Sequence, residues 1–422
     1  MSKREEVPAS LAMLGSLRHD VPLAPLTTLG LGGSAKRFVR ATTIDELRDA
    51  LRSATHPVNE GRAANAGGAS NEGSASNERS ASITGRASNE ARVSNEDHAS
   101  NEAGPSAPLG EVFTPTYEPI LILGGGSNLV VRDGGFAGLV IHMAIPGVRI
   151  EHHGDHADVV ASAGVPWDDF VAEMIAAELA GLECMSGIPG LVGATPMQNV
   201  GAYGQEVSDT ITLVRVMDRE TGEMESFEPA ACKFAYRSSV FRGTERWVVV
   251  EVHFRLPVST DSRPVRYAEL AKALGIAEGG IAPLQTVRDT VIALRRGKGM
   301  VVDENDPESR SAGSFFTNPI VSADALAQVQ ARATARVPDA RMPTFAAEGG
   351  MTKLSAGWLI ERAGFVKGTT RGNVGISKKH ALALVNRGGT TAELLSLAAE
   401  IQAGVRDVFG VELSPEPIIV GQ

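Results

Sequence analysis

The stretch Ile188–Gly204 constrains this chain more than any other, because it is uncharged, rich in glycine and carries two prolines. Glycine lets a backbone approach a ligand closely and adopt dihedral angles that other residues avoid. Proline fixes φ and stiffens the path, which lowers the entropy lost when a ligand binds. The stretch therefore predicts a rigid ligand-binding loop or, more simply, an irregular loop that crosses the core.

A repeat interrupts the globular pattern between residues 54 and 110. The tripeptide Ser-Asn-Glu recurs in a six-residue phase, which Ser82 keeps with a diverged unit, at Ser70, Ser76, Ser88, Ser94 and Ser100. A hexapeptide period can build a β-solenoid, but each turn then needs an apolar residue for the core. These units have none, so we predict a disordered insertion that takes no part in the chemistry.

Length and charge narrow the class of protein. A chain of 422 residues can form two or three domains with cores of their own, and its net charge of −10 argues against a nucleic-acid-binding face. Cys184 and Cys232 are far apart in sequence and suit neither a disulfide framework nor a zinc motif. The first residues lack the apolar stretch of a signal peptide, and no apolar run is long enough to span a membrane. We therefore expect a soluble cytoplasmic protein.

A glycine loop, Gly124–Asn128, joins a buried strand that begins at Pro119 to an apolar strand that ends at Val131. Backbone N–H groups in such a loop can bind phosphate oxygens. The Rossmann fingerprint is absent, because Leu129 stands where the third glycine would be and no helix follows. The Lys-Ser/Thr of a P-loop is absent too. The loop therefore suits a pyrophosphate held between strands.

Apolar periodicity and capping signals predict the main regular elements. Thr43 to Glu46 has capping-box spacing and opens a helix through Leu51. Two further helices are expected between Gly164 and Ala180, with Pro166 at the start, and from Thr391 to Phe409, ended by Gly410. Strands are expected at 36–39, 212–217, 247–256 and 413–420.

Four blocks occur in a fixed order: Gly124–Asn128, Ile188–Gly204, Tyr236–Ser239 and Ala312–Pro319. Taken together, they resemble the UDP-N-acetylenolpyruvoylglucosamine reductases, flavoenzymes that complete UDP-N-acetylmuramate for peptidoglycan. The likeness runs from about Leu23 to the end and is interrupted by the Ser-Asn-Glu insertion. Asn-Val-Gly-Ala-Tyr-Gly and Gly-Ser-Phe-Phe are its specific signatures.

The resemblance implies an α+β fold with a two-lobed FAD-binding domain of the vanillyl-alcohol-oxidase (PCMH) type and a smaller C-terminal α+β substrate domain. We expect a flexible leader at 1–20, a first lobe at 21–138 that contains the insertion 54–110 and is completed by 410–422, a second lobe at 139–299, and a substrate-binding domain at 300–409. The resemblance also implies two half-reactions in one cleft. NADPH reduces bound FAD and leaves, and UDP-N-acetylglucosamine enolpyruvate then enters and is reduced.

The same resemblance implies three catalytic residues. The pyruvyl carboxylate takes up negative charge as hydride reaches the vinyl carbon, and Arg237 matches the arginine that would stabilise this charge with a forked pair of hydrogen bonds. Glu416, if protonated, would donate a hydrogen bond to the same group. Ser314 matches the family's proton donor, a weak acid that suits only a strongly basic intermediate. The simpler interpretations are a surface arginine and a helix-capping serine.

Binding residues are implied as well. Cofactor contacts are expected from Gly124, Gly125, Gly126, Ser127, Asn128, Gly190, Gly193, Asn199, Gly201, Ala202 and Tyr203. Substrate contacts are expected from Tyr236, Tyr267, Lys298, Asn318 and His380. Downstream of Lys298 the chain departs from the family's shorter Lys-x-Pro-Asp form.

Other interpretations remain open at this point. His152, His153 and His156 suggest a metal cluster, but Gly154 and Asp155 beside them favour an exposed hairpin turn, and we expect no metal. The expected partners are small molecules, without nucleic acid or membrane, and the chain is expected to be a monomer. The rival functions are a flavin-dependent oxidase of the same fold acting on another substrate, and a flavin- or sugar-nucleotide-binding protein that has lost catalysis.

Overall fold

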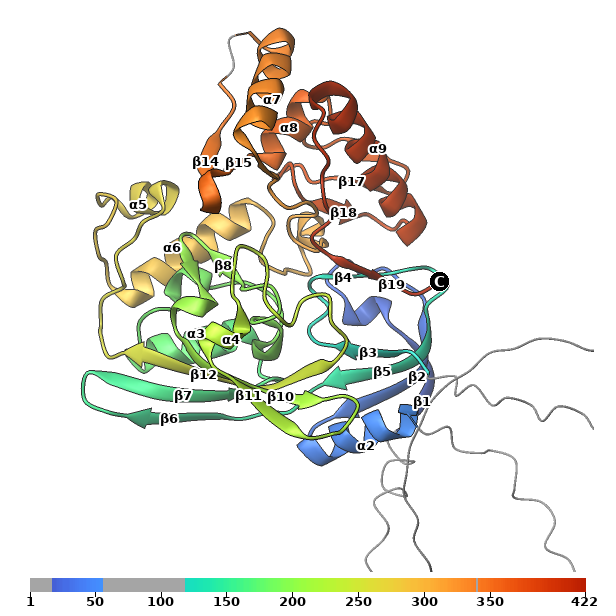
Figure 1. Cartoon of the computed structure of the whole chain (residues 1–422), viewed down its shortest axis with the longest axis vertical. Coiled ribbons are helices and arrows are strands. Elements are labelled where there is room, and N and C mark those ends of the chain that lie inside the picture. The colour runs from blue at the N-terminus through green and yellow to red at the C-terminus, as the bar shows by residue number, and fades with distance from the viewer. Residues whose placement is uncertain (1–16, 56–117, 339–340) are drawn as a thin grey trace, which may run out of the picture. The chain divides into compact units, whose positions relative to one another are not determined.

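The computed structural model describes residues 17–55, 118–338 and 341–422 (Figure 1). The chain divides into two units, Met1–His56 with Glu118–Gln422, and Pro57–Tyr117. The second unit lies outside the described residues, and so do nearly all of the predicted insertion and the first part of the predicted leader. Within the described ranges, no helix is both long and apolar enough to cross a membrane.

The first sheet has the strand order β1-β2-β5-β3 and leads into the glycine loop. β2, β5 and β3 are parallel, whereas β1 is antiparallel to β2. The apolar face of α2 packs on this sheet. The elements are β1 (Arg18–Pro22), η1 (Ala24–Leu26), β2 (Ser34–Ala41), α2 (Ile44–Thr55), β3 (Ile120–Leu123), β4 (Leu129–Val131) and β5 (Phe136–Met143).

Three element bounds bear on the expected limits here. β1 begins at Arg18, and we propose that the leader predicted at 1–20 ends before it. β5 continues past residue 138, and we propose that the first lobe extends to Met143. The helix that starts after Thr43 runs a turn beyond Leu51, and Ala54, predicted as the start of the insertion, is buried in the core. The last turn, residues 52–55, contains a single apolar residue beyond Leu51, so the apolar periodicity gives no sign of it.

The second sheet is antiparallel, with the order β11-β10-β12-β7-β6. Trp167 and Phe170 of α3 pack against Phe254 of β12, as the helical stripe predicted. The three histidines lie at the β6–β7 hairpin, which confirms the predicted turn. The elements are β6 (Val148–His152), β7 (His156–Ser162), α3 (Trp167–Ala176), β10 (Ile211–Asp218), β11 (Met224–Phe227) and β12 (Trp247–Pro257).

The stretch Ile188–Gly204 contains only short elements, so its backbone is largely irregular. It is nevertheless tied to the start of α3, because Trp167 N–H bonds to Gly190 O and Val192 N–H to Val165 O. Around and after it lie η2 (Glu183–Met185), η3 (Val192–Ala194), β8 (Gly201–Ala202), β9 (Gln205–Glu206), η4 (Val207–Asp209), α4 (Pro229–Cys232), α5 (Ala268–Leu274) and α6 (Leu284–Gly297).

The C-terminal region forms two small sheets, β13-β15-β14 and β16-β17-β18, with three helices (Figure 1). Its core also includes Leu29 and Val130 from the N-terminal part of the chain. The elements are η5 (Pro307–Ser309), β13 (Ile320–Val321), α7 (Ala323–Arg336), β14 (Thr344–Ala346), η6 (Glu348–Gly350), β15 (Thr352–Leu354), α8 (Ala356–Arg362), β16 (Thr370–Arg371), β17 (Val374–Ile376), β18 (Leu384–Asn386) and α9 (Thr391–Phe409).

The end of the chain returns to the first glycine loop. α9 has the predicted bounds, because Thr390 and Glu393 form a capping box and Gly410 ends the helix with a φ of 72°. The last strand, β19 (Ile418–Val420), is shorter than predicted and pairs in parallel with β4. The residues just before β19 are thereby fixed beside the glycine loop.

We predict that replacing residues 57–117 with a flexible linker of about 15 residues preserves the fold. Each halving of a flexible loop favours closure by about 0.6 kcal/mol, so this change should raise stability by about 1 kcal/mol. Circular dichroism and thermal unfolding of both proteins check the prediction. A large fall in melting temperature would mean that the segment packs on the rest of the chain.

Candidate active site

Two glycine-bearing loops meet backbone to backbone. A Cβ added at Gly125 would lie 2.8 Å from the Cα of Gly190, and one added at Gly126 would lie 2.0 Å from Leu26 O. Ser127 Oγ donates a hydrogen bond to Pro189 O at 3.1 Å. The first loop precedes β4 and the second follows α3 and η2, so the contact joins the two sheet regions. Only glycine permits so close an approach.

The Tyr-Arg-Ser motif forms a tight turn closed by two hydrogen bonds between Ala235 and Ser238. Arg237 is the second central residue of this turn and has a φ of 52°, a conformation that most side chains avoid. The guanidinium of Arg242 donates to the carbonyl oxygen of Arg237 and holds the turn from outside. The turn therefore fixes the direction in which the Arg237 side chain leaves the backbone.

Arg237 contacts Glu416, which the return of the chain end has brought to the same place. Arg237 Nε lies 3.1 Å from Glu416 Oε1, and its terminal nitrogen donates to Gly201 O. Gln198 links both sides, since its Nε2 lies 3.4 Å from Glu416 Oε1 and its Oε1 accepts from Asn128 Nδ2 at 3.1 Å. The side chains of Arg237 and Gln198, from two separate parts of the chain, thus converge on the Glu416 carboxyl group, and Asn128 holds Gln198 from behind.

The carboxyl of Glu416 is unusually easy to protonate. Burial raises its pKa above the ordinary value for glutamate, and this effect exceeds the opposing attraction of Arg237 and Arg242 and the hydrogen bond from Arg237. The Glu416 side chain is only 14% exposed. An approaching carboxylate ligand would raise this pKa further, because a like charge disfavours the ionised form.

Ser314 lies on the strand-like segment that runs alongside Glu416. Glu416 N–H donates to Phe315 O at 2.9 Å, and Phe316 pairs with Pro415. Gly313 before it has a φ of 73°, but a Cβ there would meet no other atom within 4 Å. The glycine is therefore needed for its backbone angle. Within the described ranges, Ser314 Oγ has no hydrogen-bond partner, and the residue caps no helix.

A second group of predicted residues gathers around Lys298. Lys298 Nζ lies 2.6 Å from Glu269 Oε2 and 5.5 Å from the centre of the Tyr203 ring, which meets the Tyr267 ring edge to face. Burial and the nearby charge of Lys298 lower the pKa of His380 to about 4, so this imidazole is neutral at pH 7. Its Nδ1 accepts from the N–H of Leu382, which leaves the proton on Nε2.

Tyr236 of the Tyr-Arg-Ser turn lies beside Asn318, which shortly precedes β13 of the C-terminal region. Asn318 Nδ2 is 3.5 Å from the Tyr236 hydroxyl, and Asn318 Oδ1 accepts from Ala356 N–H. Lys353 Nζ lies 4.4 Å above the Tyr236 ring. A cavity of about 700 Å³ adjoins Tyr236, Arg237 and Asn318. The structure thus brings the motif residues together at the edge of a space that can admit a ligand.

Several residues predicted as cofactor contacts also have visible packing roles. Gly193 sits against Ala163, where an added Cβ would lie 2.4 Å from the Ala163 Cβ. The amide of Asn199 is buried, bonded to Glu206 Oε2 at 2.7 Å and within 3.4 Å of Ala235 O. Asn199 therefore supports the Tyr-Arg-Ser turn. Gly201 and Ala202 form the short strand β8 next to it.

Two residues of the site were not assigned from the sequence. Gln198 lies inside the glycine-rich stretch, and Arg242 follows the Tyr-Arg-Ser motif by a few positions. Gln198 acts through contacts with Asn128 and Glu416, which are distant in sequence, whereas Arg242 contacts the neighbouring turn. The only signal available was their proximity to a motif.

Comparisons with family models and with curated proteins agree on one family. Residues 111–228 match the family described as "FAD binding domain", and residues 306–420 match "UDP-N-acetylenolpyruvoylglucosamine reductase, C-terminal domain". The chain is 45% identical to the UDP-N-acetylenolpyruvoylglucosamine reductase of Thermobifida fusca, over 97% of this chain and 99% of that protein. It is 52% identical to that of Saccharopolyspora erythraea, over 71% of this chain and 84% of that protein.

A solved structure shares the fold. The reductase of the same name from Thermus caldophilus has a TM-score of 0.54 to this chain, with 21% identity, and the alignment covers 96% of this chain and all of that one. At this identity the likeness concerns the fold alone. It agrees with the α+β architecture expected from the sequence, a FAD-binding region followed by a smaller C-terminal region.

We predict that Gly125→Ala weakens FAD retention about 10-fold or more, because a Cβ facing the Gly190 backbone must push the two loops apart at a cost of about 1–3 kcal/mol. The matched control is Gly357→Ala in α8, away from both loops, whose Cβ would meet Leu382 Cγ at an ordinary 3.7 Å. Flavin content after dialysis and FAD titration of the apoproteins measure the effect. Equal retention by both variants would show that the two loops do not form the FAD cradle.

Proposed function

The chain belongs to the UDP-N-acetylenolpyruvoylglucosamine reductase family, and on that basis we propose that it reduces UDP-N-acetylglucosamine enolpyruvate to UDP-N-acetylmuramate with bound FAD and NADPH. The observation that carries the proposal is the convergence of Arg237, Glu416 and the Ser314 segment at one point. A cation, an acid with a raised pKa and a hydroxyl are the three groups that this reduction needs.

The residues present fit a bound FAD. The glycine loop Gly124–Asn128 and the facing segment Ile188–Gly190 approach each other so closely that a side chain at Gly125 would collide with backbone. Their N–H groups would hold the pyrophosphate between strands. FAD bound there supplies the relay of hydride from NADPH to the enolpyruvyl group. We propose that Asn199 and Gly193 contribute by shaping these loops.

Arg237 would bind the pyruvyl carboxylate. Its guanidinium stays charged at every relevant pH, and its rigid fork matches the two carboxylate oxygens. The turn and the hydrogen bond to Gly201 O hold it in one orientation before substrate arrives. Such preorganisation stabilises the negative charge that develops on the carboxylate without rearrangement during the reaction.

Glu416 and Ser314 would handle the protons. With its raised pKa, Glu416 takes up a proton when the substrate carboxylate binds, and it can then donate a hydrogen bond to that carboxylate. Ser314 would deliver a proton to the carbon next to the carboxylate, since its hydroxyl is committed to no other hydrogen bond among the described residues. A weak acid suffices there, because the carbon being protonated is strongly basic.

The group around Lys298 would bind the nucleotide part of the substrate. Lys298 offers a charge for the diphosphate, Tyr267 is 45% exposed and can cover the nucleotide, and neutral His380 presents an Nε2–H donor. We propose that Asn318 and Tyr236 complete the binding site for the nucleotide part of the substrate. We further propose a cytoplasmic monomer that acts on small molecules, with two buried free thiols that suit a reducing compartment.

An anaerobic absorbance titration of the purified protein tests the function. NADPH should bleach the flavin band, and UDP-N-acetylglucosamine enolpyruvate should restore it. Ser314→Ala should still bleach but recover at least about 100-fold more slowly, the size expected when a proton donor is removed. Recovery only on admission of air would favour an oxidase, and loss of both steps in Ser314→Ala would indicate a folding role for Ser314.

Recovery of the flavin band is expected to slow as pH rises, because Glu416 must be protonated and its protonated form disappears above its raised pKa. Glu416→Gln, which keeps a hydrogen-bond donor at every pH, should remove this high-pH decrease and retain part of the rate. Glu416→Ala should lose about 100-fold or more at all pH values. If both variants were equally damaged, a neutral donor would not be the role of Glu416.

A further inference from the structure

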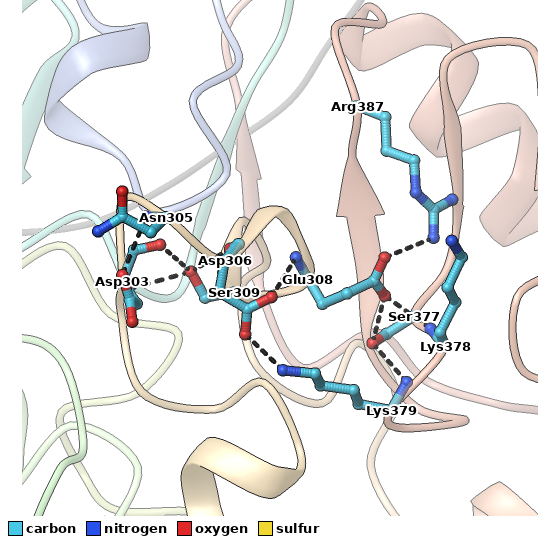
Figure 2. A network of polar contacts seen from close by, with 9 residues as sticks. All are labelled: Asp303, Asn305, Asp306, Glu308, Ser309, Ser377, Lys378, Lys379 and Arg387. Carbon is cyan, nitrogen blue, oxygen red and sulfur yellow. Dashed lines mark hydrogen bonds and ion pairs between the residues drawn. The ribbon is translucent and has the colours of Figure 1, made fainter.

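The segment after Lys298, where the sequence departs from the family's shorter form, is held by a buried glutamate. Glu308 lies in the short helix η5 and is 6% exposed. Figure 2 shows its carboxylate at the centre of a polar network that joins this segment to residues just before and just after β18. None of the catalytic or binding roles assigned above uses it.

Each oxygen of Glu308 has a partner on the opposite segment. Oε2 accepts from the Ser377 hydroxyl at 2.8 Å and from Lys378 N–H at 2.6 Å, and Oε1 accepts from Arg387 at 3.0 Å. Burial opposes ionisation, but these three donors outweigh it and hold the pKa of Glu308 below its ordinary value. The carboxylate is therefore charged at neutral pH.

The remaining contacts of the network hold the segment after Lys298 and the segment before β18 together at the protein surface. Asp306 accepts from Lys379 at 2.7 Å and from the Glu308 N–H, which begins η5. The Ser309 hydroxyl donates to Asp303 O and Asp306 O, which closes the loop on itself (Figure 2). The longer sequence after Lys298 thus folds into a compact loop with Glu308 on its inner side.

The two clamped segments carry residues of the proposed site. Downstream of Glu308, Phe315 N–H donates to Leu382 O at 2.7 Å, so the Ser314 segment lies against the segment that carries His380. Upstream, a Cβ added at Gly299, which follows Lys298 and has a φ of 68°, would lie 2.8 Å from Glu308 O. Glu308 therefore lies where the segments of Lys298, Ser314 and His380 come together, and its carboxylate adds a link to the segment of His380.

We propose that Glu308 is a positioning residue for the reduction. It clamps the segment that carries Ser314 to residues 377–387 and so sets Ser314 against the bound sugar nucleotide. This inference rests on the proposed function. A misplacement of about 1 Å in a reacting group can slow a reaction about 100-fold, so a residue without substrate contact can control the rate in this way.

The test compares Glu308→Gln with the full-length wild-type protein by anaerobic stopped-flow. Glutamine keeps the size of the side chain, but it cannot accept from Arg387 and from the Ser377 side at once without turning its own N–H₂ toward a donor. Recovery of the flavin band with the sugar nucleotide should slow about 10-fold or more, whereas bleaching by NADPH should change by less than about threefold. The matched control is Glu400→Gln, whose carboxylate pairs with Arg371 on the exposed side of α9, and it should change neither step.

A double variant separates positioning from general loss of structure. If Glu308 acts through Ser314, Glu308→Gln should not slow recovery further in a Ser314→Ala background. Should Glu308→Gln fail to fold, Ser377→Ala removes a single donor and should give the same selective effect at smaller size. Recovery at the wild-type rate, equal slowing of both steps, or independent effects in the double variant would each overturn the proposal. A wild-type protein that does not recover at all would refute the proposed function itself, and the clamp with it.

Discussion

The site depends on the parallel pairing of β19 with β4, the last strand of the chain with the strand that leaves the first glycine loop. Ile418 lies opposite Leu129, and Ile418 N–H bonds to Asn128 O, so the register is fixed at the loop itself. Glu416 precedes this pairing by two residues. A slip by one residue would turn its side chain to the other face and leave the guanidinium of Arg237 without its carboxylate.

The buried Glu308 and the largely buried Glu416 show how local donors decide the state of a carboxyl group. Glu308 receives three hydrogen bonds, one from an arginine, and its pKa is lowered despite burial. Glu416 faces Arg237 and a more distant Gln198, and burial prevails, so its pKa is raised. The number of donors within reach thus separates a carboxylate that clamps two segments from a carboxyl that can exchange a proton.

The sequence could predict those features that depend on residues close together in the chain. α9 has its expected bounds because Thr390, Glu393 and Gly410 act within a few residues of the helix ends. The glycine loops and the Tyr-Arg-Ser turn were likewise found as motifs. Glu308 and Gln198 were not found from the sequence, because their partners are distant in the chain. The partners of Glu308 lie 69 to 79 positions away, and those of Gln198 lie 70 to 218 positions away. A buried acid in a polar stretch has the composition of a surface loop until its partners are known.

The backbone at the site carries strain that the same contacts hold in place. In the part of the chain that the structure describes, six residues other than glycine have positive φ, and Asn199, Tyr203 and Arg237 are among them. Each such residue destabilises the fold by about 1 kcal/mol relative to a glycine at the same position. A glycine would relieve the strain at Asn199, Tyr203 or Arg237, but it would remove an amide, a ring or a guanidinium. The amide of Asn199 reaches toward Ala235 O, beside the turn that forces Arg237 into this conformation. Because the Asn199 amide contacts the turn that carries Arg237, a change that relaxes Asn199 also releases the orientation of Arg237 toward Glu416.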